Sequence, residues 1–258
     1  MSVLFEVENH VARVTINRPD RMNAVDQATE AELIRIWETI EKDGSVRVVV
    51  LTGAGERAFC TGADMKSGGG MTGLEYWAAP RPGGFGGLAL RDSLDVPVIA
   101  RVNGHALGGG MEMMLGCDIV VAAETATFGL PEPRVGRLAL DGGIAILPRR
   151  IAHVWAMGLL LTGKRIKADE ALRLGLVNEV APSAGLDETV ERWVADILAC
   201  APLSVRAIKQ MVRAGAGLRA HDAQMLRLPA LVKALKSTDQ EEGVRAFQEK
   251  RAPVWRGE

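Results

Sequence analysis

The feature that most constrains the fold of this chain is a glycine-rich turn between two apolar segments. Residues 96–102 and 119–123 are short, apolar and rich in β-branched side chains, as expected of buried strands. Between them stand three consecutive glycines, at positions 108–110, followed by a run that is compatible with a short helix. Buried strands joined by a turn and a helix favour an α/β fold.

The same turn is a candidate anion site. Glycine has no Cβ, so backbone N–H groups can approach a ligand closely, and a helix that starts there directs its unpaired N–H groups to the same point. Glu112 follows two residues after the glycines, among apolar neighbours. An acid–base group beside such a turn would suit a reaction that passes through an oxyanion. Taken alone, however, the turn could be a packing device and Glu112 a residue that favours the helix dipole.

Composition limits the kinds of partner that the chain can have. Among 258 residues, 31 are Lys or Arg and 32 are Asp or Glu, so no net field attracts nucleic acid or an acidic membrane. Three scattered cysteines are typical of reduced thiols rather than a disulfide framework. No apolar run is long enough to cross a bilayer and no targeting segment is visible, so we expect a cytoplasmic protein.

The rest of the chain alternates between strand and helix patterns before it becomes purely helical. Residues 3–17 predict a hairpin with its turn at 8–10, residues 27–43 a helix capped by Asp26, and residues 46–51 a buried strand. Residues 67–87 are rich in Gly and Pro, with few residues able to anchor a core, and predict a mobile loop or lid. Further elements are expected at 144–161, 168–174, 176–180, 186–200, 202–214, 219–235 and 238–250. The apolar faces of the helical tail indicate a subunit interface.

Several short motifs need to be weighed separately. Residues 53–58 imitate a dinucleotide fingerprint, but no helix follows them, so a turn is the better interpretation. Gly62, in a second glycine turn, could again bring backbone N–H groups close to a ligand. Glu132 is held between two prolines and in isolation reads as a surface turn residue, and Asp141, before two glycines, reads in the same way.

Several segments, in this order and at these spacings, resemble the signature segments of the enoyl-CoA hydratase/isomerase (crotonase) superfamily. They are residues 17–24, 58–64, 103–112, 128–132, 161–165 and 246–255. The resemblance covers nearly the whole chain. It implies a crotonase-like spiral of ββα units at residues 1–195 and a C-terminal, all-helical oligomerisation region at residues 196–258, which forms a homotrimer or a dimer of trimers. It also implies an acyl-CoA thioester as substrate.

The resemblance assigns roles to individual residues. The backbone N–H groups of Ala63 and Gly109 would hold the thioester oxygen, and Glu112 and Glu132 would form the catalytic acid–base pair. The residues implied to bind substrate are Ala24, Ala63, Asp64, Met65, Lys66, Gly108 and Gly109. Two carboxyls beside one water could deliver a proton to C2 and activate the water at C3. No metal or redox cofactor is needed, and the four histidines lack ligand spacing.

The sequence also departs from the family pattern, which keeps alternatives open. Residues 136–143 differ from the run common in hydratases, and Leu130 stands where a polar residue is frequent. Asp141 lies near the position where some isomerases and dehalogenases of the family keep an acting carboxylate. The main prediction is therefore an enoyl-CoA hydratase, and the alternatives are an enoyl-CoA isomerase or a dehydratase of a substituted 3-hydroxyacyl-CoA. A non-catalytic acyl-CoA-binding protein is disfavoured, because it needs no pair of glutamates.

Overall fold

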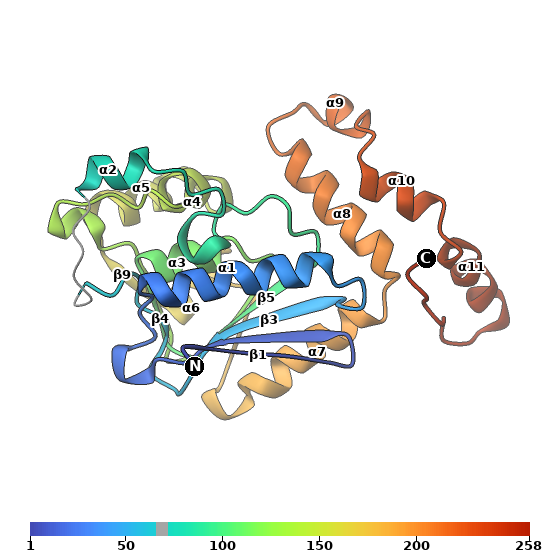
Figure 1. Ribbon diagram of the computed structural model, residues 1–258, viewed down its shortest axis with the longest axis horizontal. Helices are drawn as coiled ribbons and strands as arrows, with labels where there is room; N and C mark the ends of the chain where they lie inside the picture. The colour runs from blue at the N-terminus through green and yellow to red at the C-terminus, as the bar shows by residue number, and fades with distance from the viewer. Residues whose placement is uncertain (66–71) are drawn as a thin grey trace.

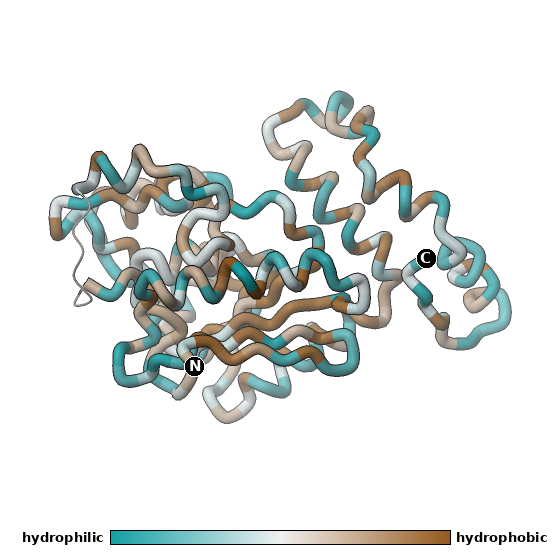
Figure 2. Tube along the Cα trace, in the orientation of Figure 1, coloured by the Kyte–Doolittle hydropathy of each residue, from teal (hydrophilic) through white to brown (hydrophobic). Residues whose placement is uncertain are grey.

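The computed structural model describes residues 1–65 and 72–258, and its centre is a six-stranded sheet. The order is β1 (Val3–Glu8), β2 (Val11–Ile16), β3 (Val48–Gly53), β5 (Val98–Val102), β7 (Ile119–Ala123) and β10 (Glu179–Ala181). Strands β1 and β2 form the predicted antiparallel hairpin, whereas every other neighbouring pair is parallel. Figure 2 shows the strands as mostly hydrophobic, in agreement with the predicted buried strands.

A second sheet of short strands lies at the carboxyl ends of the first. Its order is β4 (Ala58–Cys60), β6 (His105–Leu107), β8 (Thr127–Gly129) and β9 (Arg165–Lys167). The chain visits one strand in each sheet and then forms a helix, as in β3–β4–α2, β5–β6–α3 and β7–β8–α4. This repeat of strand, strand and helix is the predicted ββα spiral. It brings the turns that follow β4, β6 and β8 to one side of the molecule.

Helix α1 (Gln27–Lys42) confirms the predicted helix and its cap. The Asp26 side chain accepts a hydrogen bond from the Thr29 N–H at 2.9 Å, which satisfies one of the free N–H groups of the first turn. The apolar face of α1 covers the core, and buried Trp37 donates a hydrogen bond to the Gly86 carbonyl at 2.8 Å. Figure 1 shows α1 lying across the strands of the large sheet.

Residues 72–87 differ from the prediction of a loop with few core anchors. They include helix α2 (Gly73–Ala78) and the 3₁₀ turn η2 (Phe85–Gly87). Thr72 and Glu75 form a reciprocal capping box at the start of α2, and Phe85 is buried against the core. Helix α2 buries no side chain, so the anchor that the glycine and proline content concealed is Phe85. The remainder of the predicted loop, at 66–71, lies outside the described residues.

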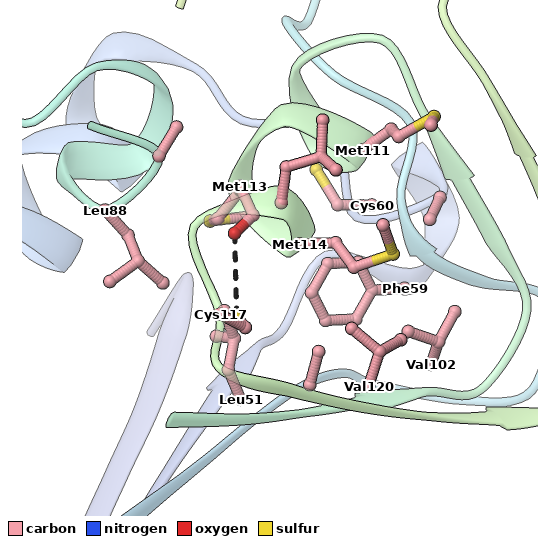
Figure 3. Close-up of a cluster of buried hydrophobic side chains, with 14 of the residues drawn as sticks. Leu51, Phe59, Cys60, Leu88, Val102, Met111, Met113, Met114, Cys117 and Val120 are labelled. Carbon is pink, nitrogen blue, oxygen red and sulfur yellow. Dashed lines mark hydrogen bonds between the residues drawn. The ribbon is translucent and has the colours of Figure 1, made fainter. Parts of the chain in front are cut away.

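Short helix α3 (Gly109–Leu115) is surrounded by core side chains. Met111, Met113 and Met114 are fully buried, and Figure 3 shows Met111 and Met114 near Phe59 and Cys60 of β4, with Met113 on the side of Leu88 and Cys117. Flexible thioether side chains fill irregular space well. This packing on several sides of α3 fixes the orientation of the one carboxylate that the helix carries.

The remaining helices complete the spiral and the tail. The apolar stretch 144–161 divides into α4 (Gly143–Arg150) and α5 (His153–Thr162), and the predicted helix after it is α6 (Ala168–Arg173). The other 3₁₀ turns are η1 (Pro19–Arg21), η3 (Glu132–Val135) and η4 (Ser183–Gly185). The tail consists of α7 (Leu186–Leu198), α8 (Pro202–Gly215), α9 (Ala220–Gln224), α10 (Pro229–Leu235) and α11 (Asp239–Glu249). The stretch predicted at 219–235 is thus two helices.

After α7 the tail leaves the face of the large sheet, and α8 remains bonded to the segments beside the sheet through Lys209–Asp118 and Arg213–Asp95. Helix α7 packs on the large sheet through Leu186, Val190 and Val194, whereas Figure 1 shows α8 to α11 extending away from both sheets. Large apolar side chains on these outer helices are uncovered in the single chain, and Phe247 is 85% exposed. The predicted boundary at 195 and the predicted trimer remain predictions. In the described part of the chain, no helix has both the length and the apolar character to span a membrane.

Candidate active site

The turns after β4 and β6 bring two backbone segments into contact. Ala63 forms an isolated parallel bridge with Val25, in which Gly62 O accepts from Val25 N–H and Asp64 N–H donates to Val25 O, both at 2.9 Å. This bridge uses the backbone of Gly62 and Asp64, so the N–H of Ala63 takes no part in it. A Cβ built on Gly62 would lie 3.0 Å from the Gly109 nitrogen. The N–H groups of Ala63 and Gly109 therefore belong to adjoining segments.

Helix α3 begins at Gly109, directly after Gly108, a glycine that another residue could not easily replace. Gly108 has φ 56° and ψ −132°, a conformation that strongly favours glycine. A Cβ at this position would also lie 2.9 Å from Glu132 Oε1. The glycine thus allows the turn to form and the Glu132 carboxyl to lie directly against it.

Glu112 lies in the first turn of α3 and is only 4% exposed. Its Oε1 accepts a hydrogen bond from the Gly143 N–H at 2.9 Å. Burial raises the pKa of Glu112 to about 8, and the charges of Asp141 and Glu132 contribute to the shift, although the Gly143 hydrogen bond opposes it. Glu112 is therefore held mainly protonated at neutral pH by its surroundings.

Glu132 opens the 3₁₀ turn η3 between Pro131 and Pro133. Burial raises the pKa of this carboxyl too. Its Oε2 atom is buried and has no hydrogen-bond partner among the described residues. A buried, unsatisfied carboxylate oxygen is costly unless a ligand or water meets it. The reading of Glu132 in isolation, as a surface turn residue, is thus wrong.

Both carboxyls and both N–H groups line one cavity of about 500 Å³. Its wall also includes apolar side chains, so that few polar groups face a mostly apolar space, as is typical of small-molecule sites. These apolar residues are Met65, Phe85, Pro131, Val135, Leu138 and Leu140.

The other residues predicted to bind substrate lie around this cavity. Met65 lies on the cavity wall and is 70% exposed. Asp64 pairs with Arg18 at 3.0 Å, and the carbonyl of buried Ala24 accepts a hydrogen bond from the same guanidinium, so Arg18 ties these two segments together. Lys66 lies outside the described residues.

A polar cluster at the cavity wall was not foreseen from the sequence. Asp141 is 6% exposed and accepts a hydrogen bond from the hydroxyl of Tyr76 in α2. The Arg81 Nε lies 3.6 Å from Asp141 Oδ1, and its guanidinium stacks 4.4 Å above the Tyr76 ring. Glu30 of α1 pairs with the other side of Arg81 at 2.5 Å. Tyr76 is the only tyrosine in the chain, but its position in a Gly- and Pro-rich stretch concealed its role.

The structure thus combines a ββα spiral with a cavity that is lined by two carboxyls and by the glycine turns after β4 and β6. A family model for enoyl-CoA hydratase/isomerase matches residues 6–258. The chain is 41% identical to an (E)-benzylidenesuccinyl-CoA hydratase of Thauera aromatica, over all of both chains. It is 37% identical to a carnitinyl-CoA dehydratase of Escherichia coli, over 96% of this chain and 95% of that one. Among solved structures, an enoyl-CoA hydratase of Bacillus anthracis is 34% identical over both full lengths, with a TM-score of 0.91.

The chain therefore belongs to the enoyl-CoA hydratase/isomerase family. It is an enzyme of the hydro-lyase kind and has the crotonase spiral fold, which confirms the predicted family, enzyme class and fold. Family membership implies an acyl-CoA thioester as substrate. Among the described residues, no group of three His, Cys, Asp or Glu side chains is placed to hold a metal ion.

Proposed function

We propose that the enzyme adds water reversibly across the 2,3 double bond of an α,β-unsaturated acyl-CoA, with Glu112 and Glu132 as the acid–base pair. The observation that supports this proposal best is that the buried Glu112, the half-buried Glu132 and the residues that carry the two backbone N–H groups line a single cavity. A protein that only bound acyl-CoA would gain nothing from two glutamates whose pKa values are raised by burial.

In this proposal the N–H groups of Ala63 and Gly109 hold the thioester oxygen. They polarise the conjugated system, so that C3 becomes electrophilic and negative charge collects on the oxygen. Coenzyme A would pass along Ala24, Asp64, Met65 and Lys66. The wall of the cavity would receive the acyl group.

The two carboxyls would share one proton and bind one water between them. The ionised carboxyl takes a proton from the water as its oxygen bonds to C3, and the electron pair of the double bond moves towards the thioester oxygen. The protonated carboxyl then supplies a proton to C2. One water has been added, and the pair still holds one proton, now on the other carboxyl.

Dehydration of a substituted 3-hydroxyacyl-CoA is the same chemistry in reverse, and two observations favour a substituted acyl group. The relatives named above are a benzylidenesuccinyl-CoA hydratase and a carnitinyl-CoA dehydratase. The cavity, at about 500 Å³, is also within the size range of sites for drug-sized ligands. Double-bond isomerisation is the second candidate, because Asp141 adds a third carboxylate to the cavity wall.

The test is the loss of the enoyl-thioester absorbance when purified enzyme meets crotonyl-CoA and an aryl-substituted enoyl-CoA. Glu112→Gln and Glu132→Gln should each lower kcat by about 10²–10⁴-fold, the usual contribution of one acid–base group, while CoA binding measured by calorimetry persists. Glu124→Gln, a change at an exposed site, is the matched control and should remain active. Full activity of Glu132→Gln would contradict the two-carboxyl mechanism. Turnover of a 3-enoyl-CoA without hydration would favour the isomerase.

A further inference from the structure

Two glycines at the start of α3 are closely approached by other segments of the chain. A Cβ on Gly110 would clash with the carbonyl oxygen of Cys60 in β4. A Cβ on Gly109 would lie 2.5 Å from both Cδ2 and Cε2 of Phe85, which is too close for any side chain to fit. The ring of Phe85 therefore lies directly against the Cα of Gly109.

Phe85 belongs both to the core and to the cavity wall. It is only 5% exposed, yet it lines the cavity that contains the two carboxyls. The N–H of Gly109, at the start of α3, donates to no acceptor in the part of the chain that the structure describes. The ring thus packs beside a backbone donor that remains available to a ligand.

The turn that carries this ring is itself held by α1. The Gly86 carbonyl accepts a hydrogen bond from Trp37 Nε1 at 2.8 Å, and the Gly86 N–H donates to Glu30 Oε1 at 3.2 Å. A Cβ on Gly86 would lie 2.6 Å from Met113 Sδ, so the turn is packed between α1 and α3. Because the backbone beside Phe85 is bonded on both its polar groups and packed against a core side chain, the ring has little freedom to move.

The precise position of a hydrogen-bond donor decides how well it stabilises an oxyanion. The donor has to lie about 2.7–3.1 Å from the place where the negative charge develops, and a displacement of about 1 Å in an active site can cost about 10²-fold in rate. Gly109 has no side chain that could anchor it in the core. The Phe85 ring supplies this anchor from another segment of the chain.

We propose that Phe85 is a positioning residue that fixes the Gly109 N–H in the direction of the thioester oxygen. This inference rests on the proposed function, in which that N–H is one of the two donors. Phe85 exchanges no proton with the substrate and acts through its contact with the Cα of Gly109. Glu30 and Trp37 of α1 contribute indirectly, because they hold the turn that carries the ring.

The experiment measures the infrared stretch of the thioester carbonyl in bound butyryl-CoA, isotope-labelled at that carbonyl. Butyryl-CoA has no double bond to hydrate or to move, so the band reports on the hydrogen bonds to the oxygen alone. In the wild-type enzyme these bonds should lower the frequency from its value in solution. In Phe85→Leu the band should move back towards the solution value, because Leu leaves part of the space beside Gly109 empty.

Two further variants make the measurement decisive. Ile99→Val changes a fully buried residue of the large sheet that does not line the cavity, so it controls for a loss of core packing and should keep the wild-type band. Phe85→Met fills a similar volume with a flexible side chain and provides the same readout if Phe85→Leu does not fold. With an enoyl-CoA substrate, Phe85→Leu should lower kcat by about 10–10²-fold and change KM little.

The inference and the proposed function fail in different ways. A wild-type band in Phe85→Leu, with weaker binding of butyryl-CoA or without it, would make the ring a contact of the core or of the acyl group only, and would overturn the inference while hydration stands. A band that returns towards the solution value in Phe85→Leu supports the inference, even if the enzyme hydrates no enoyl-CoA. A wild-type band at the solution frequency would mean that no N–H meets the thioester oxygen, which overturns the inference together with the proposed anion hole.

Discussion

Replacing Glu112 by Gln should stabilise the folded enzyme at alkaline pH and change its stability little in acid. The carboxyl is 4% exposed, and its pKa is raised from 4.5 to about 8 by burial and by nearby negative charge. In the unfolded chain the same carboxyl ionises near 4.5. Between these values the folded state binds more protons than the unfolded state, so stability falls as pH rises.

The magnitude follows from this shift. Each pKa unit corresponds to about 1.4 kcal/mol, so a shift from 4.5 to about 8 corresponds to about 5 kcal/mol. The stabilising contribution is complete below about pH 4.5 and is lost as pH rises through about 8. Gln can still accept the Gly143 hydrogen bond and does not ionise. About 3 of these pKa units fall between pH 5 and pH 9, so the stability of Glu112→Gln relative to the wild type should increase by about 4 kcal/mol across that range.

Thermal unfolding at fixed protein concentration measures the effect. For a chain of this size 1 kcal/mol shifts Tm by roughly 2–4 °C, so the difference in Tm between variant and wild type should grow by roughly 8–16 °C from pH 5 to pH 9. Glu124→Gln, at an exposed site, controls for the loss of one charge. A Tm difference that stays constant across this range would show that Glu112 ionises in the fold without penalty, and the reasoning from burial would be refuted.

Three further changes test other parts of the site and the tail. Gly62→Ala places a Cβ 3.0 Å from the Gly109 nitrogen at φ +90°, so it should separate the two N–H donors and lower kcat by about 10²–10³-fold, while circular dichroism shows an intact fold. Tyr76→Phe removes a part-buried hydrogen bond to Asp141 and should cost about 1 kcal/mol in urea unfolding; no loss would mean that this bond is not formed in solution. Phe247→Asp places a charge at an apolar side chain that is 85% exposed, so it should reduce the oligomer size in analytical ultracentrifugation; unchanged assembly would exclude α11 from the interface.

The sequence predicted the parts of this structure that depend on local pattern. The hairpin at β1 and β2, the cap at Asp26 and the strands around the triple glycine each follow from neighbouring residues. The helical spacing of apolar residues did not reveal where one helix ends and the next begins. The stretch 144–161 is interrupted after Arg150, and the stretch 219–235 is interrupted between α9 and α10. The first break, at residues 151–152, contains neither Gly nor Pro, whereas Pro229, the first residue of α10, was a sign of the second break that the prediction missed.

The cavity itself was less predictable, because it depends on contacts between distant segments. Glu132 is flanked by prolines and gives no local sign of burial, yet the β8–η3 connection places it against Gly108. The polar cluster of Tyr76, Arg81 and Asp141 also joins distant segments. Tyr76 and Asp141 are 65 residues apart in the sequence, and no spacing rule connects them. The family resemblance supplied the pair of glutamates and pointed to Asp141, but only the fold shows that Tyr76 and Arg81 contact Asp141 at the cavity wall.

In the proposed mechanism, the groups that would bind the oxyanion and those that would set the proton chemistry come from different parts of the fold. The two N–H groups come from the turns after β4 and β6, which are held by sheet pairing and by the fully buried methionines of α3. The second and third carboxylates come from η3 and from the turn before α4, which contribute no strand to either sheet. A substitution at Glu132 or Asp141 can therefore alter where protons reside without disturbing the N–H pair. The same spiral can thus polarise one thioester carbonyl and, with different carboxylates around it, direct the proton either to hydration or to movement of the double bond.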